Sequence, residues 1–155
     1  MSTWTVPFTA FGAEVSLVKT ELMRAVENVL DSGRYILGPE VTSFEREFAE
    51  YCQAKFSAGV ANGTCALHLA LRGMEFANGD EVITAPNSFI ASASSIALAG
   101  AKPVFVDVCD DGNMDPQRLE DAITDRTRAI VPVHLTGRLA KMNDINRFKD
   151  ITEIM

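Results

Sequence analysis

The chain has 155 residues, 47% of them hydrophobic, with a net charge of -7 and a pI of about 4.8. This length is enough for one domain with a hydrophobic core, and the hydrophobic content excludes a disordered chain. The acidic balance, with basic residues scattered among acids, argues against a nucleic-acid-binding protein.

No segment of the sequence is typical of export or of membrane insertion. Residues 1–14 lack the charged region and the long apolar core of a signal peptide. The longest run of small and apolar residues, 89–101, is too short and too rich in serine to span a bilayer. The three cysteines form no C-x-x-C pair, and there are only two histidines. We therefore expect a cytoplasmic protein with reduced cysteines and no metal site.

Two amphipathic helices are predicted in the first third of the chain. Apolar residues recur at spacings of three and four from Val15 to Val29, and Gly33 suits the C-cap of that helix. Pro39 suits the first turn of a second helix. The apolar face of this second helix would consist of Val41, Phe44, Phe48 and Tyr51. Residues 1–55 are thus expected to be an N-terminal helical region.

From residue 56 onward, short apolar runs alternate with helical patterns. Strands are predicted over 56–61, 82–85, 102–108 and 128–134. Helices are predicted over 64–74, 88–100, 116–123 and 142–150. This alternation over 56–155 predicts βα repeats with right-handed crossovers. The expected fold is a three-layer α/β/α arrangement around a mostly parallel sheet, in a single domain of residues 1–155.

The segment from Cys109 to Pro116 contains several carboxylates, but it fits a calcium-binding loop only in part. Asn113 and Met114 break the EF-hand pattern. We interpret the segment as a solvated turn, followed by a helix with Asp115 as its N-cap.

Candidate site residues follow from the rule that ligands of an open parallel sheet bind beyond the carboxyl ends of its strands. The segments after the four predicted strands contain 62–64, 86–89, Asp107 and His134. Asp107 could bind a cation or a ring nitrogen, but we interpret it mainly as the cap of the turn that follows it. His134 could hydrogen-bond a ligand at this edge of the sheet.

Gly63 and Thr64 stand where a predicted strand meets a predicted helix. A helix N-terminus offers free N–H groups and a partial positive charge, glycine permits close approach, and the Thr64 hydroxyl adds a donor, so the pair could hold a phosphate. Alternatively, Thr64 simply caps a helix that begins at Cys65. The loop matches neither the dinucleotide fingerprint nor the P-loop. Phe89 could stack on a flat ligand, or it could be a core residue of its helix.

Taken in order, several segments resemble the DegT/DnrJ/StrS family of sugar aminotransferases, which depend on pyridoxal 5'-phosphate (PLP) and have the fold type I architecture. The matching segments are "SGRYILGPEVTSFEREFAEYC", "VANGTCALHLAL", "GDEVITAPNSFIASASSIALAGAKPVFVDV", "MDPQRLEDAI" and "RAIVPVHLTG". The resemblance covers the chain from about Val6 to Phe148. It implies an incomplete PLP-binding large domain.

The resemblance also implies roles for particular residues. Gly63, Thr64 and Cys65 match the segment that binds the cofactor phosphate, and Phe89 matches the aromatic residue that stacks on the pyridine ring. Tyr35 and His134 are candidates on the substrate side. The implied reaction transfers an amino group, with glutamate as the expected donor, to a nucleotide-linked keto sugar for polysaccharide biosynthesis. A homodimer is expected for a full-length member.

The resemblance does not extend to the family's Schiff-base lysine. None of the lysines in the chain stands at that position, so no catalytic residue is identified, and the chain alone is expected to be an inactive N-terminal part. Two alternatives stay open. One is a non-catalytic remnant that binds a phosphorylated ligand or a partner. The other is a PLP-dependent sugar dehydratase of the same family, in which histidine replaces the lysine.

Overall fold

The computed structural model describes residues 9–150 and 152–155, and the chain divides into two compact units, Met1–Gly59 and Val60–Met155. The boundary falls close to the predicted change from a helical region to βα repeats. Whether the chain behaves as a single domain stays a prediction.

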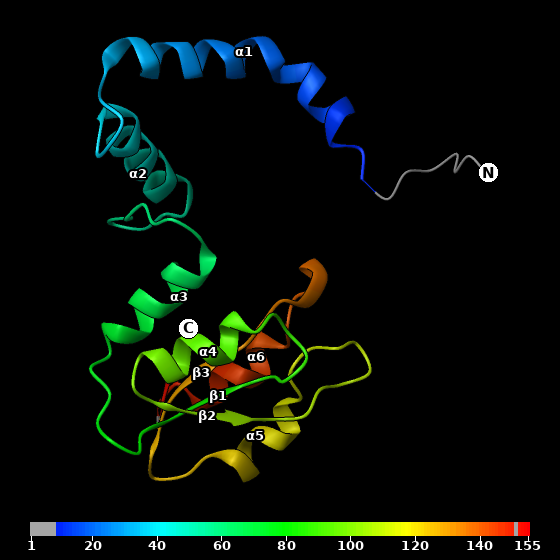
Figure 1. The fold of residues 1–155 in the computed structure, drawn as a ribbon. Coiled ribbons are helices and arrows are strands. Elements are labelled where there is room, and N and C mark those ends of the chain that lie inside the picture. Colours follow the sequence, from blue (N-terminus) through cyan, green and yellow to red (C-terminus); the bar gives the residue numbers. More distant parts are fainter. Residues whose placement is uncertain (1–8, 151) are drawn as a thin grey trace, which may run out of the picture. The chain divides into compact units, whose positions relative to one another are not determined.

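The N-terminal unit contains helix α1 (Phe11–Ser32) and helix α2 (Pro39–Tyr51) (Figure 1). Helix α1 ends as predicted, because Gly33 adopts a left-handed φ of 63° and its N–H donates to Leu30 O at 3.2 Å. Helix α2 begins with Pro39, also as predicted. On its apolar face the rings of Phe44 and Phe48 stack with centroids 5.5 Å apart.

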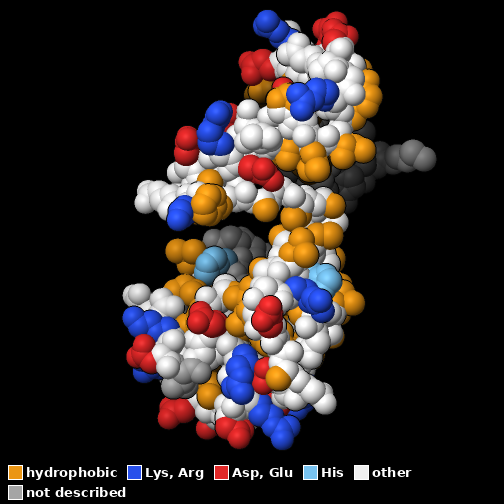
Figure 2. All heavy atoms as spheres, turned by 90° about the vertical axis from the view of Figure 1, so that its left-hand side faces the viewer, with side chains coloured by type: hydrophobic (Ala, Val, Ile, Leu, Met, Phe, Trp, Pro, Cys, Tyr) orange, Lys and Arg blue, Asp and Glu red, His pale blue; other side chains and the backbone are white. Residues whose placement is uncertain are grey.

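Helix α1 has the predicted apolar face, but none of its side chains is buried. Val15, Val18, Leu22 and Val26 are between 44% and 52% exposed. Figure 2 shows hydrophobic side chains gathered on the surface of the unit that contains α1 and α2. Helix α2 therefore does not supply the packing that this face of α1 requires.

The second unit is built around a parallel sheet. Its strands are β1 (Glu81–Thr84), β2 (Lys102–Phe105), β3 (Thr127–Val131) and β4 (Glu153–Ile154), in the order β2-β1-β3-β4. The helical elements are α3 (Gly63–Arg72), α4 (Ala91–Leu98), α5 (Pro116–Ala122), η1 (Leu135–Gly137), α6 (Met142–Ile145) and η2 (Asn146–Phe148). All strand pairs are parallel, which confirms the predicted sheet. Strand β4 is an addition to the prediction.

Side chains that alternate between the two faces of the sheet pack against helices on both faces, which gives three layers. In β1, Val82 belongs to a buried cluster that includes Leu71 of α3 and Ile96 of α4. The next residue, Ile83, belongs to a separate cluster that includes Leu119 of α5. Successive side chains of a strand point to opposite faces, so each face of the sheet is covered by its own helices. Figure 1 shows α4 and α5 on opposite sides of the strands, as the α/β/α prediction requires.

The predicted strand over 56–61 is wrong, because these residues form no strand. A strand needs a neighbour for its backbone hydrogen bonds, and no strand of the described residues pairs with this segment. Among the boundaries that differ from the prediction, two lie next to candidate site residues. Strand β3 ends at Val131, directly before Pro132, which has no N–H to donate. Helix α4 begins only at Ala91, so Phe89 precedes it.

The interpretation of the 109–116 segment as a solvated turn is wrong in part. Asn113 and Met114 are only 2% and 1% exposed. Val108 and Met114 form an antiparallel bridge that folds the loop back on itself. Asp115 is the N-cap of α5, as predicted, with its side chain accepting from Gln117 N at 2.9 Å.

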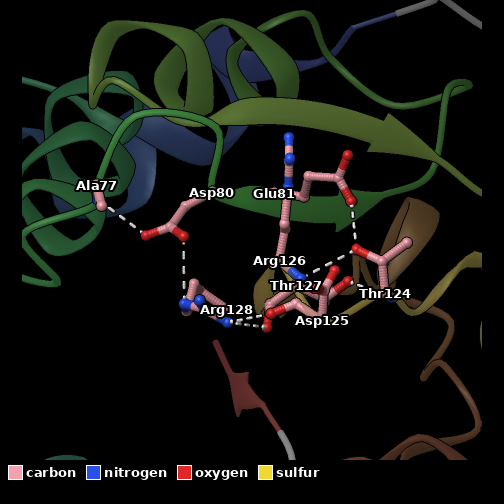
Figure 3. A network of polar contacts seen from close by, with 8 residues as sticks. All are labelled: Ala77, Asp80, Glu81, Thr124, Asp125, Arg126, Thr127 and Arg128. Carbon is pink, nitrogen blue, oxygen red and sulfur yellow. Dashed lines mark hydrogen bonds and ion pairs between the residues drawn. The ribbon is translucent and has the colours of Figure 1, made fainter.

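A polar network joins the strands at their amino ends (Figure 3). Glu81, the first residue of β1, accepts from Lys102 Nζ at 2.9 Å and from Thr124 Oγ1 at 2.8 Å. The neighbouring Asp80 pairs with Arg128 of β3 at 3.2 Å. The hydrogen bonds from Lys102 and Thr124 lower the pKa of the buried Glu81 carboxyl. The network therefore favours the ionised carboxylate and ties the first residues of β1 and β2 together.

We expect Glu81→Gln to lower the free energy of unfolding at pH 7 by about 1 kcal/mol, since it removes hydrogen bonds to a charged group whose lysine partner is largely exposed. Because folding lowers the pKa of Glu81, its contribution is present above the unfolded pKa of about 4.3 and is lost as the pH falls through the folded value. Urea unfolding at pH 7 and near pH 3 measures both effects. Glu120→Gln, at an exposed position of α5, is the control. An equal loss for Glu81→Gln at both pH values would contradict the charge-dependent contribution.

Candidate functional site

The candidate site lies at the carboxyl edge of the sheet, where two asparagine side chains join the loops. Asn87, after β1, donates from Nδ2 to Gly112 O in the loop after β2 at 2.9 Å. Asn113, in that same loop, accepts from Leu135 N after β3 at 3.0 Å. The loops after three neighbouring strands are thus held together at the edge where ligand binding was predicted.

Helix α3 begins at Gly63 with Asn62 as its N-cap. The Asn62 side chain accepts from the N–H of Cys65 at 2.9 Å, and its backbone is extended. The alternative in which Thr64 caps this helix is therefore wrong, since Asn62 has that role and Thr64 lies inside the first turn.

The first turn of α3 keeps donors available for a ligand. Within the described part of the chain, the N–H groups of Gly63 and Thr64 and the Thr64 hydroxyl have no hydrogen-bond partner. The N–H of Cys65 is already used by Asn62. The free donors lie at the positive end of the helix, where an anion is stabilised.

Protein packing does not explain the glycine at position 63. A Cβ added to Gly63 would meet no atom within 4 Å, and the backbone there does not adopt a positive φ. Neither a neighbouring side chain nor the local conformation demands glycine. The open space beside two free N–H groups fits a phosphate that approaches the backbone closely.

The α3 N-terminus is connected to α4, the helix that follows Phe89. Ser95 of α4 is fully buried, and its hydroxyl donates to Thr64 O at 3.4 Å. The Phe89 side chain is 74% exposed. The alternative in which Phe89 is a core residue is therefore wrong, and its ring is accessible for stacking on a ligand.

The histidine after β3 has a defined ring orientation. His134 accepts from Ala140 N through Nδ1 at 3.1 Å. In a neutral imidazole the other nitrogen, Nε2, then carries the proton and is a donor.

Asp107 accepts from Val108 N at 2.8 Å and caps the turn after β2, as the preferred interpretation required.

Tyr35 belongs to the N-terminal unit, whereas the other predicted site residues belong to the second unit. Its hydroxyl donates to Leu30 O at 3.1 Å, near the end of α1. The side chain is 64% exposed. Its substrate-side role stays a prediction.

Asn113 is not among the predicted site residues, although it organises this edge of the sheet together with Asn87, which lies in the predicted 86–89 segment. Both stand in segments rich in turn-forming residues, where asparagine is expected for local reasons. A buried asparagine that bonds to distant loops has no local signature. The structure alone identifies it.

Two further properties bear on the class of site. In residues 9–150 and 152–155, no helix is long and apolar enough to cross a membrane. Over the same residues, His, Cys, Asp and Glu form no group of three or more that could hold a metal ion. Cys52, Cys65 and Cys109 are free.

Comparisons with known proteins identify relatives over most of the chain. The chain is 45% identical over 146 residues to dTDP-3-amino-3,4,6-trideoxy-alpha-D-glucose transaminase of Streptomyces venezuelae, an alignment that covers 94% of this chain and 38% of the relative. The crystal structure of S. venezuelae DesV in complex with a ketimine intermediate matches with a TM-score of 0.89 at 45% identity, covering 96% of this chain and 40% of that one. NtdA of Bacillus subtilis with bound cofactor PMP matches with a TM-score of 0.89 at 28% identity, covering 99% of this chain and 36% of that one.

The chain thus spans about two fifths of the length of these relatives. The family model for DegT/DnrJ/EryC1/StrS aminotransferases matches residues 17–155, which include the α3 N-terminus, the Phe89 segment and His134. The chain belongs to the DegT/DnrJ/EryC1/StrS aminotransferase family.

Proposed function

We propose that the chain is the cofactor-binding part of a PLP-dependent aminotransferase that acts on a nucleotide-linked keto sugar. The observation that carries the proposal is the first turn of α3, where Gly63 leaves open space beside free N–H groups. Relatives named as sugar transaminases and a structural neighbour with bound PMP support the same assignment.

The phosphate of PLP would be held by the first turn of α3. The N–H groups of Gly63 and Thr64 and the Thr64 hydroxyl are the donors that a phosphate requires. Cys65 follows them, but its N–H is bound to Asn62, so its contribution would be through its half-buried side chain. Asn62 orders the turn and so presents the donors in a fixed arrangement.

The ring of PLP would be oriented by Phe89. The exposed Phe89 side chain offers an aromatic face in the loop at the carboxyl end of β1. When bound, PLP supplies the electron sink for amino-group transfer. The residues of this chain would bind the phosphate and fix the plane of the ring. The catalytic lysine that the family implies matches none of the lysines in this sequence.

The substrate side of the proposal assigns roles to two residues. His134 would donate from Nε2–H to a substrate oxygen, since its Nδ1 is occupied by Ala140 N. Tyr35, which is exposed, would contact the nucleotide sugar. The proposed amino donor is glutamate. Relatives named as transaminases of dTDP-linked and UDP-linked sugars support the substrate class.

We further propose that two copies of the full protein associate through the apolar face of α1. This face has no buried side chain, although Val15, Val18, Leu22 and Val26 continue along it. Such a surface is typical of a protein contact. We expect light scattering after size-exclusion chromatography to show a dimer, and Leu22→Glu to shift it toward monomer. Arg24→Glu, at an exposed position on the opposite side of α1, is the control. A monomeric full protein would contradict the proposal.

Titration with PLP tests the cofactor assignment directly. Addition of the chain is expected to change the PLP absorbance in a saturable way. Inorganic phosphate should compete with PLP, because the proposed site binds the phosphate group of the cofactor. Pyridoxal, which lacks the phosphate, should bind far more weakly. With PLP, glutamate and a keto-sugar nucleotide, the 155-residue chain should show no turnover above the PLP-only background. Equal affinity for pyridoxal and PLP would contradict the phosphate site, and chain-dependent turnover would contradict the inactivity.

A further inference from the structure

Asn113 is the most completely bonded buried side chain at the carboxyl edge of the sheet. It is 2% exposed and uses both ends of its amide. Its Oδ1 accepts from Leu135 N at 3.0 Å, and its Nδ2 donates to Arg138 O at 3.3 Å and to Leu139 O at 3.4 Å. One side chain from the loop after β2 therefore forms hydrogen bonds to the loop after β3 at both ends of a short turn.

The turn between these contacts has an unfavourable backbone conformation. Thr136 has a φ of 53°, and Gly137 has a φ of 83°. A positive φ is a genuine outlier for a β-branched residue and persists only where the surroundings enforce it. Within the turn, Gly137 N donates to His134 O at 3.1 Å and Arg138 N donates to Leu135 O at 3.0 Å. The hydrogen bonds of Asn113 to Leu135 on one side and to Arg138 on the other constrain the two ends of the turn in addition.

The same turn determines how the His134 ring is held. His134 precedes the turn and Ala140 follows it, and the N–H of Ala140 donates to His134 Nδ1 at 3.1 Å. This bond forms only if the turn brings residue 140 back to residue 134. Ala140 is itself buried and packs in the cluster beneath the sheet edge.

We infer that Asn113 is a positioning residue that closes the 134–140 turn and thereby holds His134 as an Nε2–H donor at the candidate site. That the His134 donor binds a sugar-nucleotide substrate rests on the proposed function. That Asn113 fixes the orientation of the His134 ring does not rest on it. Asn113 acts through the turn and is not assigned a contact with the ligand.

The nitrogen spectrum of the histidine rings tests this inference in the full chain, because the chain has only two histidines. His68 lies in the middle of α3, away from the turn, and is an internal reference. In the wild type, ¹⁵N correlation spectra above neutral pH should show His134 as the single Nε2–H tautomer. Asn113→Asp keeps the acceptor for Leu135 but places a carboxylate oxygen against two carbonyl oxygens. We expect it to abolish the single-tautomer signature of His134 and leave the His68 signals unchanged.

Two further variants keep the test decisive. Asn87→Ala removes the other amide contact to the same loop, the bond to Gly112 O, and should leave the His134 tautomer intact. Asn113→Ala removes the hydrogen bonds to Leu135, Arg138 and Leu139 without adding charge. It should also abolish the single-tautomer signature of His134. If the His134 signals stay unchanged in folded Asn113→Asp and Asn113→Ala proteins, the inference is overturned. A chain that fails to bind PLP while these spectra change as expected would contradict the proposed function and leave the positioning role standing.

Discussion

Thr64→Val is expected to weaken PLP binding by about one to two orders of magnitude without a comparable loss of stability. The substitution keeps the shape of the side chain and removes a hydroxyl that has no hydrogen-bond partner within the described residues. A hydrogen bond to a charged acceptor contributes about 1.5–3 kcal/mol, which corresponds to that loss of affinity. Absorbance titration with PLP and a melting curve for each variant measure the two quantities.

Asn62→Ala is the matched control, because it removes the N-cap of the same helix. The Asn62 side chain bonds to Cys65 N at 2.9 Å, so its loss should lower stability by about 1 kcal/mol. Its effect on PLP affinity should be smaller than that of Thr64→Val, since Asn62 only orders the turn and the proposed phosphate donors are on Gly63 and Thr64. If Thr64→Val lowers the melting temperature and leaves the affinity unchanged, Thr64 is a structural residue and the phosphate site is wrong.

Gly63→Ala distinguishes an effect on PLP binding from an effect on protein stability at the same turn. The added Cβ would meet no protein atom within 4 Å, so the variant should fold as well as the wild type. The methyl group would instead occupy the space proposed for the phosphate, and PLP affinity should fall. Gly63→Val, with a larger side chain, should lower it further. Unchanged affinity in both variants would show that this space is not used by the ligand.

The second large effect is expected for Ile130→Ala in the sheet. Ile130 lies in β3, between β1 and β4, is fully buried, and packs in the cluster that includes Ile83 and Leu119. Removing a buried side chain of this size loses its transfer free energy and leaves a cavity, at a combined cost of about 2–5 kcal/mol. Urea unfolding followed by circular dichroism measures the change.

Ile90→Ala in the same unit controls for the type of substitution. Ile90 is 69% exposed at the start of α4, so its loss should change the free energy of unfolding by less than about 0.5 kcal/mol. Similar effects of Ile90→Ala and Ile130→Ala would mean that the face of the sheet with Ile130 is not packed as described.

The candidate site could be predicted in part because the segments with Phe89 and His134 follow strands, whereas the predicted strand before Gly63 does not form. Parallel strands place their carboxyl ends along one edge, so the segments with Phe89 and His134 were assigned to a common site from strand predictions alone. The residue that caps α3 could not be resolved in this way. Asn62 and Thr64 are both good capping residues, and the choice depends on where the first turn begins, which is Gly63 and not the Cys65 of the alternative with Thr64 as the cap.

The sequence by itself determined the α/β class, the sheet of β1, β2 and β3, the capping residues Gly33 and Asp115, and the family. These depend on periodicity, on local turn chemistry and on the order of short segments. Only the tertiary structure decided that 56–61 forms no strand, that Asn113 is buried, and that Phe89 is exposed. Each of these depends on partners distant in the chain: a strand requires a neighbouring strand, and a buried amide requires acceptors and donors that the loop after β3 supplies.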